Sequence, residues 1–164
     1  MPLLPQITAI APDYTIREAD LADADVLIAF TIREAMEAEG CGLDAEDVRR
    51  GVESVLAKPL GAGCWVAECA SGQVVASTSI VTEWSNFHGG YYWWIQSLFI
   101  LPDHRRRGLA ERLLEHVAKV AGEAGALDLR LYAHKSNQRA LEAYRRCGFS
   151  VAPYTIMTKS LRRE

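Results

Sequence analysis

Six consecutive residues from Arg105 to Ala110 have the sequence RRRGLA, in which three arginines precede a glycine. They follow an apolar run that ends at Leu101 and precede a stretch whose leucines and valines recur at helical spacing. A strand that passes through a glycine turn into a helix leaves backbone N–H groups unpaired, and the dipole at that helix end attracts anions. Because arginine supplies planar, permanently charged donors, the pattern predicts a phosphate site. The alternative interpretation is a solvated loop that forms surface ion pairs.

Asn137, Ala140 and Tyr144 form a second group with regular spacing. Residues 137 and 144 are almost two helical turns apart, so they would share one face of a helix with the small Ala140 between them. A narrow ligand arm could lie along this face. From spacing alone it is equally open that Asn137 caps the helix and that Tyr144 packs in the core.

The hydrophobic pattern predicts the elements that would position these groups. We expect strands at 14–18, 64–69, 74–81, 91–101 and 127–133, with a final pair of strands around Pro153, and helices at 21–38, 44–58 and 108–122. A connection is expected at 83–90, and Ser136 is expected to cap a short helix that ends at Cys147. This order predicts an α/β fold with a sheet of mixed direction and helices on both faces.

Composition limits the class of protein. The chain has 164 residues, of which 49% are hydrophobic, so we expect one domain over 1–164 with an irregular arm at 1–12. A net charge of −3 argues against a nucleic-acid partner. Because no long apolar segment or leader pattern occurs, we expect a cytoplasmic protein with no membrane partner. The four cysteines include no C-x-x-C pair and the histidines are scattered, so no metal site is expected.

These motifs together resemble the GNAT superfamily of N-acetyltransferases. The likeness rests on Arg105-x-x-Gly108-x-Ala110 after a strand, on Asn137 about thirty residues later, and on Tyr144 followed by Gly148-Phe149. It covers nearly the whole chain, because the order of elements also matches. The resemblance implies a single-domain acyl-CoA N-acyltransferase fold with a mostly antiparallel central sheet, whose fourth and fifth strands, here 91–101 and 127–133, splay apart.

The resemblance also implies acetyl-CoA as co-substrate, without a metal. Backbone N–H groups of the turn would hold the pyrophosphate, and the main chain of the fourth strand would bind the pantetheine arm. The implied acetyl-CoA contacts are Leu98, Phe99, Ile100, Arg105, Arg106, Arg107, Gly108, Leu109, Ala110, Asn137, Ala140 and Tyr144. The N–H of Leu98 would stabilise the oxyanion, and the phenol of Tyr144 would act as general acid toward the leaving thiolate.

The general base is not fixed by the sequence. Histone-acetylating relatives carry a glutamate on the fourth strand, whereas this chain has no Asp or Glu between Glu83 and Asp103. Glu83 and Gln96 are candidates, directly or through a water relay. The acceptor cation would be attracted by carboxylates and aromatic rings. These candidate substrate-binding residues are Glu37, Glu39, Glu83, Trp84 and Tyr92, although Glu37 and Glu39 also fit a solvated helix end.

The sequence therefore favours an acetyl-CoA-dependent N-acetyltransferase that acts on a primary amine of a small molecule. The amine would attack directly in a ternary complex, with Tyr144 as general acid. A protein lysine or N-terminal acetyltransferase is one alternative, and a non-catalytic acyl-CoA sensor on the same fold is another. The resemblance also suggests a homodimer, because members of the superfamily often pair through their C-terminal strands.

Overall fold

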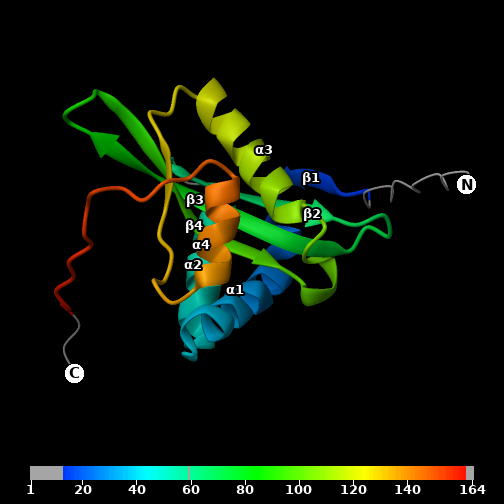
Figure 1. Ribbon diagram of the computed structural model, residues 1–164. Coiled ribbons are helices and arrows are strands. Elements are labelled where there is room, and N and C mark those ends of the chain that lie inside the picture. Colours follow the sequence, from blue (N-terminus) through cyan, green and yellow to red (C-terminus); the bar gives the residue numbers. More distant parts are fainter. Residues whose placement is uncertain (1–12, 59, 162–164) are drawn as a thin grey trace, which may run out of the picture.

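A five-stranded sheet in the order β1-β2-β3-β4-β5 forms the centre of the fold (Figure 1). β1 (Thr15–Glu18), β2 (Ala62–Glu68), β3 (Val74–Ser85) and β4 (Gly90–Ile100) pair antiparallel, and β5 (Leu129–Leu131) runs parallel to β4. The computed structural model describes residues 13–58 and 60–161, so the predicted arm at 1–12 lies outside the described residues. The arrangement confirms the predicted α/β fold with a mostly antiparallel sheet.

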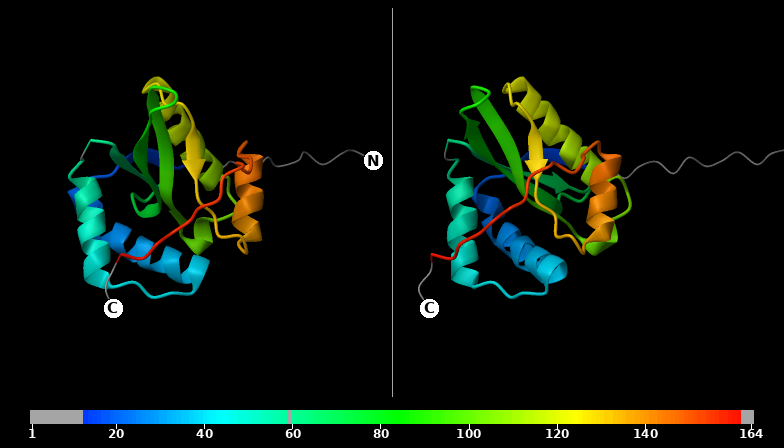
Figure 2. Two further views of the ribbon diagram at one scale, coloured as in Figure 1. Left: turned by 90° about the vertical axis from the view of Figure 1, so that its left-hand side faces the viewer. Right: turned by 60° about the vertical axis from the view of Figure 1, so that its left-hand side comes forward.

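The helices cover both faces of this sheet (Figure 2). α1 (Ala24–Glu39) and α2 (Ala45–Leu56) lie on one side, and α3 (Leu109–Glu123) and α4 (Gln138–Arg146) lie on the other. Local capping explains the ends of the first two helices: Asp20 closes a capping box before α1, Gly40 ends α1 at a φ of 67°, and Asp44 caps α2. None of the helices in the described residues is long and apolar enough to cross a membrane.

The side chains of β2 alternate between the two faces of the sheet and contribute to the core on both sides. Cys64 and Val66 pack in one cluster with residues of α1 and α2, whereas Trp65 and Ala67 pack in clusters with residues of α3. Successive side chains of a strand point to opposite faces, so a continuous apolar strand buries both of its faces. β2 is therefore a central strand between two helical layers.

The β3–β4 hairpin is longer than the sequence predicts. β3 continues to Ser85, so Glu83 and Trp84 lie in a strand, and the connection is only the turn at 86–89. Cross-strand pairs explain the extension, because Trp84 faces Tyr91 with ring centroids 5.0 Å apart and Glu83 faces Tyr92. The expected connection at 83–90 is thus wrong for its first three residues, which belong to β3, and for Gly90, which begins β4.

The C-terminal part of the chain differs most from the sequence prediction. β5 has three residues instead of the predicted 127–133, α4 is capped by Asn137 instead of Ser136, and no strand forms at 149–161. Residues 150–161 are all exposed. A strand needs a neighbour for its backbone hydrogen bonds, and β5 is too short to provide one. The predicted final pair of strands is therefore wrong for the described residues.

Candidate active site

The outer edge of β4 is open where β4 and β5 separate. Their pairing covers Trp93 to Ile95 of β4 and stops there. At the same point Ser97 pairs with Ser79 while Ile95 pairs with Ile80, so Gln96 is an extra residue that forms a bulge. A bulge bends its strand, and the following residues of β4 carry backbone groups without a β5 partner.

The RRRGLA turn lies between this edge and α3. Arg106 has a φ of 59° and Gly108 a φ of 74°, and α3 begins directly after Gly108. No side chain of the described residues caps α3, so the first N–H groups of the helix, including those of Leu109 and Ala110, are available to an anion. Leu109 is buried and anchors the helix start in the core. The geometry fits the predicted phosphate site.

Positive charge converges beside this turn. A cavity of about 460 Å³ is lined by Pro102, Arg105, Arg106 and Arg139. Arg139 comes from the first turn of α4, which brings it to the turn across the fold. Arg139 is not among the residues predicted from the sequence; the available signal was its position two residues after Asn137. Arg107 is exposed and is not part of the lining.

The side chain of Arg105 is already engaged within the protein. Its Nε donates to the carbonyl of Ile100 at 2.8 Å, and its Nη2 contacts Glu37 Oε2 at 2.6 Å. The guanidinium also lies over the ring of Phe99, with 5.5 Å between its carbon and the ring centroid. Arg105 thus ties the end of α1 to the turn through an ion pair with Glu37.

A carboxylate that the sequence analysis did not select reaches the open edge of β4. The N–H of Leu98 donates to Glu34 Oε1 at 2.9 Å. Burial raises the pKa of Glu34, this hydrogen bond lowers it in part, and the negative charge of Glu37 raises it further. The signal for Glu34 was its position seven residues after Leu27 and four after Phe30, both buried, on the face of α1 that turns to the core.

Tyr144 and Leu98 come from distant parts of the chain and pack against one buried cluster, which includes Ile95 and Leu114. Burial raises the pKa of the Tyr144 phenol, and the nearby negative charge of Glu34 raises it further. Asn137 accepts a hydrogen bond from the N–H of Ala140 at 3.2 Å, so its side chain caps α4.

The remaining candidate residues lie elsewhere. Glu83 accepts a hydrogen bond from Trp94 Nε1 at 2.6 Å, and the Tyr92 hydroxyl lies 2.9 Å from His88 Nδ1. Tyr92 is six positions before Leu98 on β4, which corresponds to roughly 20 Å along a strand. Trp84 is exposed near the same end of the hairpin, and Glu39 is exposed at the end of α1. The structure therefore does not bring these acidic and aromatic groups together with Leu98.

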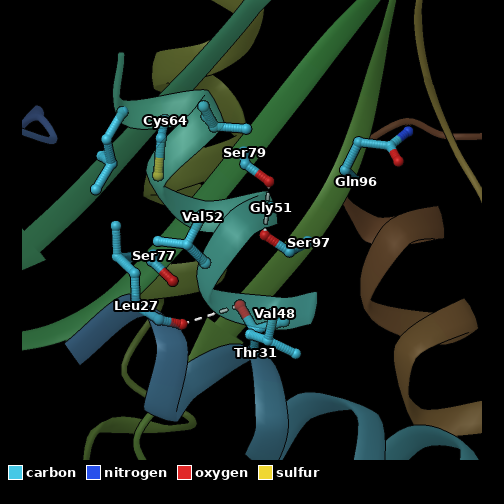
Figure 3. A pocket seen from close by; sticks show the side chains of 12 residues that line it. Leu27, Thr31, Val48, Gly51, Val52, Cys64, Ser77, Ser79, Gln96 and Ser97 are labelled. Atoms are coloured by element: carbon cyan, nitrogen blue, oxygen red, sulfur yellow. Dashed lines mark hydrogen bonds between the residues drawn. The ribbon is translucent and has the colours of Figure 1, made fainter. Parts of the chain in front are cut away.

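A second cavity, of about 230 Å³, lies between α1, α2 and the sheet (Figure 3). Its lining consists of Leu27, Thr31, Val48, Gly51, Val52, Val55, Leu56, Cys64, Ser77, Ser79, Gln96 and Ser97. The helices contribute mainly apolar groups and the sheet contributes hydroxyls, of which Ser79 and Ser97 lie 2.8 Å apart. Gln96 and Ser97 directly precede Leu98, and Thr31 is one helical turn from Glu34. The cavity therefore adjoins the site at Leu98.

Comparisons with known proteins agree with this geometry. The model of a family described as the acetyltransferase (GNAT) family matches residues 29–149. A thialysine N-epsilon-acetyltransferase from Bos taurus is 27% identical over an alignment of 143 residues that covers 81% of this chain and 82% of that protein. A possible acetyltransferase from Clostridium difficile 630 has a crystal structure that matches with a TM-score of 0.84 at 26% identity, covering 92% of this chain and 99% of that one. An aminoglycoside N-acetyltransferase in complex with CoA shares the fold, with a TM-score of 0.75 at 15% identity over 98% of this chain and 100% of that one.

Proposed function

Because the chain belongs to the acetyltransferase (GNAT) family, we propose that it transfers the acetyl group of acetyl-CoA to a primary amine of a small molecule. One observation carries the proposal: the fold combines an open edge of β4 at Leu98 with an uncapped helix start at α3, and Tyr144 packs against the same buried cluster as Leu98. These three features provide backbone amides for hydrogen bonding, an anion site and a proton donor. They match the three parts of a thioester donor: amide-containing arm, phosphates and leaving thiol.

The donor fits the groups that the chain offers. Bound acetyl-CoA supplies an activated acetyl thioester. The first N–H groups of α3 hold the pyrophosphate, and Arg106 and Arg139 add positive charge from the lining of the adjacent cavity. Arg105 acts differently, because its side chain keeps the turn attached to Ile100 and Glu37.

Two groups of the chain assist the transfer. The N–H of Leu98 donates a hydrogen bond to the acetyl oxygen, which gains negative charge when the amine attacks. The hydroxyl of Tyr144 gives its proton to the departing sulfur. A phenol is protonated below its pKa, so the raised pKa of Tyr144 keeps this proton in place at neutral pH.

A small acceptor is favoured over a protein. The cavity next to Leu98 holds about 230 Å³, less than the usual range of small-molecule sites of roughly 300–1,000 Å³. The relative from Bos taurus that spans most of this chain is named for a small amine, thialysine. Both observations support a small-molecule amine as the acceptor.

The experiment that tests the proposal measures thiol release from acetyl-CoA with a panel of small amines and lysine peptides. Tyr144→Phe should lower kcat by about 100-fold or more, because general acids contribute roughly 10²–10⁴-fold. Its affinity for CoA should stay within about twofold, since the ring and its packing remain. Tyr91→Phe, on an exposed tyrosine near the turn of the β3–β4 hairpin, is the matched control. Unchanged kcat in Tyr144→Phe would remove the general-acid role, and tight CoA binding without transfer to any amine would favour a sensor.

A homodimer is the second part of this proposal. Residues 150–161 expose large apolar side chains, namely Val151, Tyr154, Ile156, Met157 and Leu161. A second copy of the chain could bury this surface, which a soluble monomer seldom leaves uncovered. Light scattering coupled to size exclusion would give twice the monomer mass if the proposal holds and the monomer mass if it does not.

A further inference from the structure

The carboxylate of Glu34 lies on the open edge of β4 without a cationic partner among residues 13–58 and 60–161. Its only hydrogen bond within these residues comes from the N–H of Leu98. A carboxylate withdrawn from water is unfavourable unless a cation or further donors compensate. This group is therefore ready to accept a cation from outside the chain.

The charged groups around Glu34 do not fill that role. Glu37, one turn further along α1, adds negative charge and is itself paired with Arg105. The guanidinium of Arg33 lies over the Phe99 ring, 5.3 Å from its centroid. From α4, Tyr144 lies near enough for the negative charge of Glu34 to raise the pKa of its phenol, which carries no positive charge. Among the described residues, Arg105 and Arg33 thus each interact with a partner other than Glu34.

We propose that Glu34 binds the ammonium group of the acceptor and removes its proton, while the uncharged remainder of the acceptor occupies the cavity between α1, α2 and the sheet. The inference rests on the proposed function, and it deepens it by naming the acceptor class. That class is a primary amine with one positive charge and a short tail that is apolar or carries a hydroxyl.

The lining of the cavity defines the tail. No charged side chain lines it, so a second ammonium or a carboxylate on the acceptor would lose its water without gaining a partner. Valine and leucine side chains of the helices face a row of serines on β3 and β4, including Ser77 and the Ser79–Ser97 pair (Figure 3). This combination suits an alkyl chain that ends in a hydroxyl.

Proton and bond changes balance with the groups present. Glu34 Oε takes one proton from the ammonium, and the nitrogen lone pair then forms the new C–N bond. As the C–S bond breaks, Tyr144 gives its proton to the sulfur, and the second proton lost by the nitrogen restores the Tyr144 hydroxyl through solvent. The proton on Glu34 leaves to solvent, so each turnover releases one proton.

Glu34 also has to change partner during this reaction. In the free protein it accepts the hydrogen bond from Leu98, the same N–H that stabilises the acetyl oxygen in the proposed mechanism. An N–H that turns to the acetyl oxygen releases the carboxylate. The base therefore becomes available when the donor is in place, which suits direct attack in a ternary complex.

The first experiment compares the pH dependence of kcat in the wild type and Glu34→Gln, with acetyl-CoA and 4-aminobutan-1-ol. Glutamine keeps an oxygen for the Leu98 N–H, so the variant should fold. At pH 7 we expect kcat to fall by about 100-fold or more, the usual contribution of a general base. The deficit should shrink as pH rises toward the amine pKa near 10, because the free amine then needs no base. Glu123→Gln, on the exposed end of α3, is the control.

The outcomes separate the inference from the proposed function. If the wild type transfers acetyl to no amine, the proposed function fails. If the wild type is active and Glu34→Gln keeps its kcat at pH 7, the inference is wrong. A loss of kcat that is equal at pH 7 and pH 10 also overturns it, because a merely structural defect would not be repaired by deprotonating the substrate.

The second experiment tests the proposed uncharged tail of the acceptor with two amines of equal chain length. We expect kcat/KM for 4-aminobutan-1-ol to exceed that for 1,4-diaminobutane by about tenfold or more, which corresponds to the cost of an unpaired polar group. Gly51→Phe at the rim of the cavity should raise the KM for 4-aminobutan-1-ol and leave that for methylamine unchanged. Gly122→Phe is the matched control, since a side chain at either helical glycine starts in open space. Preference for the diamine, or a KM that Gly51→Phe does not change, would overturn the assignment of the tail.

Discussion

Replacing Arg17 by methionine removes the cation that ties β1 to the start of α1. Arg17 makes two hydrogen bonds to Asp23, at 2.8 and 2.9 Å, and its Nε donates to Glu68 at 2.8 Å. Asp23 is only 5% exposed, so the variant leaves a buried carboxylate without its partner. Methionine retains the length and the apolar stem of the side chain, so the change is mainly one of charge.

The structure sets the size of the effect. Breaking a buried ion pair costs about 3–5 kcal/mol, but the Arg17 side chain is 35% exposed and water screens part of the interaction. We therefore expect a loss of about 2–3 kcal/mol in the free energy of unfolding, which lowers Tm by roughly 4–12 °C for a domain of this size. Arg49→Met, which removes surface ion pairs to Asp25 and Glu53, should change stability by less than about 1 kcal/mol.

The effect should depend on pH in a defined direction. Hydrogen bonds from Arg17 hold the pKa of Asp23 below its usual range, so the pair stabilises the fold above the unfolded pKa of about 3.9. This stability is lost as pH falls through the folded pKa. Thermal melts of both proteins between pH 7 and pH 3 should show the difference in Tm closing below about pH 4. Equal Tm values at pH 7, or a difference that does not change with pH, would refute this account of the pair.

Three further results are expected. Gly108→Val should weaken CoA binding and lower stability by about 1–2 kcal/mol, because a side chain is strained at a φ of 74°. If calorimetry gave the wild-type affinity for CoA, the turn would not be the pyrophosphate site. Arg139→Gln should weaken CoA binding about tenfold and make the affinity less dependent on salt concentration. A salt dependence equal to that of the wild type would place Arg139 outside the phosphate site. Alkylation followed by mass spectrometry should label Cys69 first, because a hydrogen bond from Ser71 lowers its pKa. Cys64 should stay unlabelled, because burial raises its pKa to about 12; early labelling of Cys64 would show that the core opens.

Much of the fold could be read from local patterns. The caps at Asp44 and Gly40, the glycine before α3 and the apolar run of β4 each act within a few residues, so the sequence located the corresponding elements closely. Boundaries that depend on a partner were less predictable. β3 extends to Ser85 because β4 pairs with it, and residues 149–161 form no strand in a fold where β5 pairs over only three residues.

The sequence by itself led to the proposed donor site of this protein. The RRRGLA turn and the spacing of Asn137 and Tyr144 are local signals, because a helix start and a helix face are set by neighbours along the chain. The proposed acceptor site follows only from the tertiary structure. The contacts of Glu34 with Leu98 and of Glu37 with Arg105 join residues 64 and 68 positions apart. The packing of α1 over the open edge of β4 makes Glu37 an anchor for Arg105 and leaves Glu34 without a cationic partner among the described residues. Helical spacing can place Glu34 on the buried face of α1, but it does not show which group each carboxylate meets across the fold.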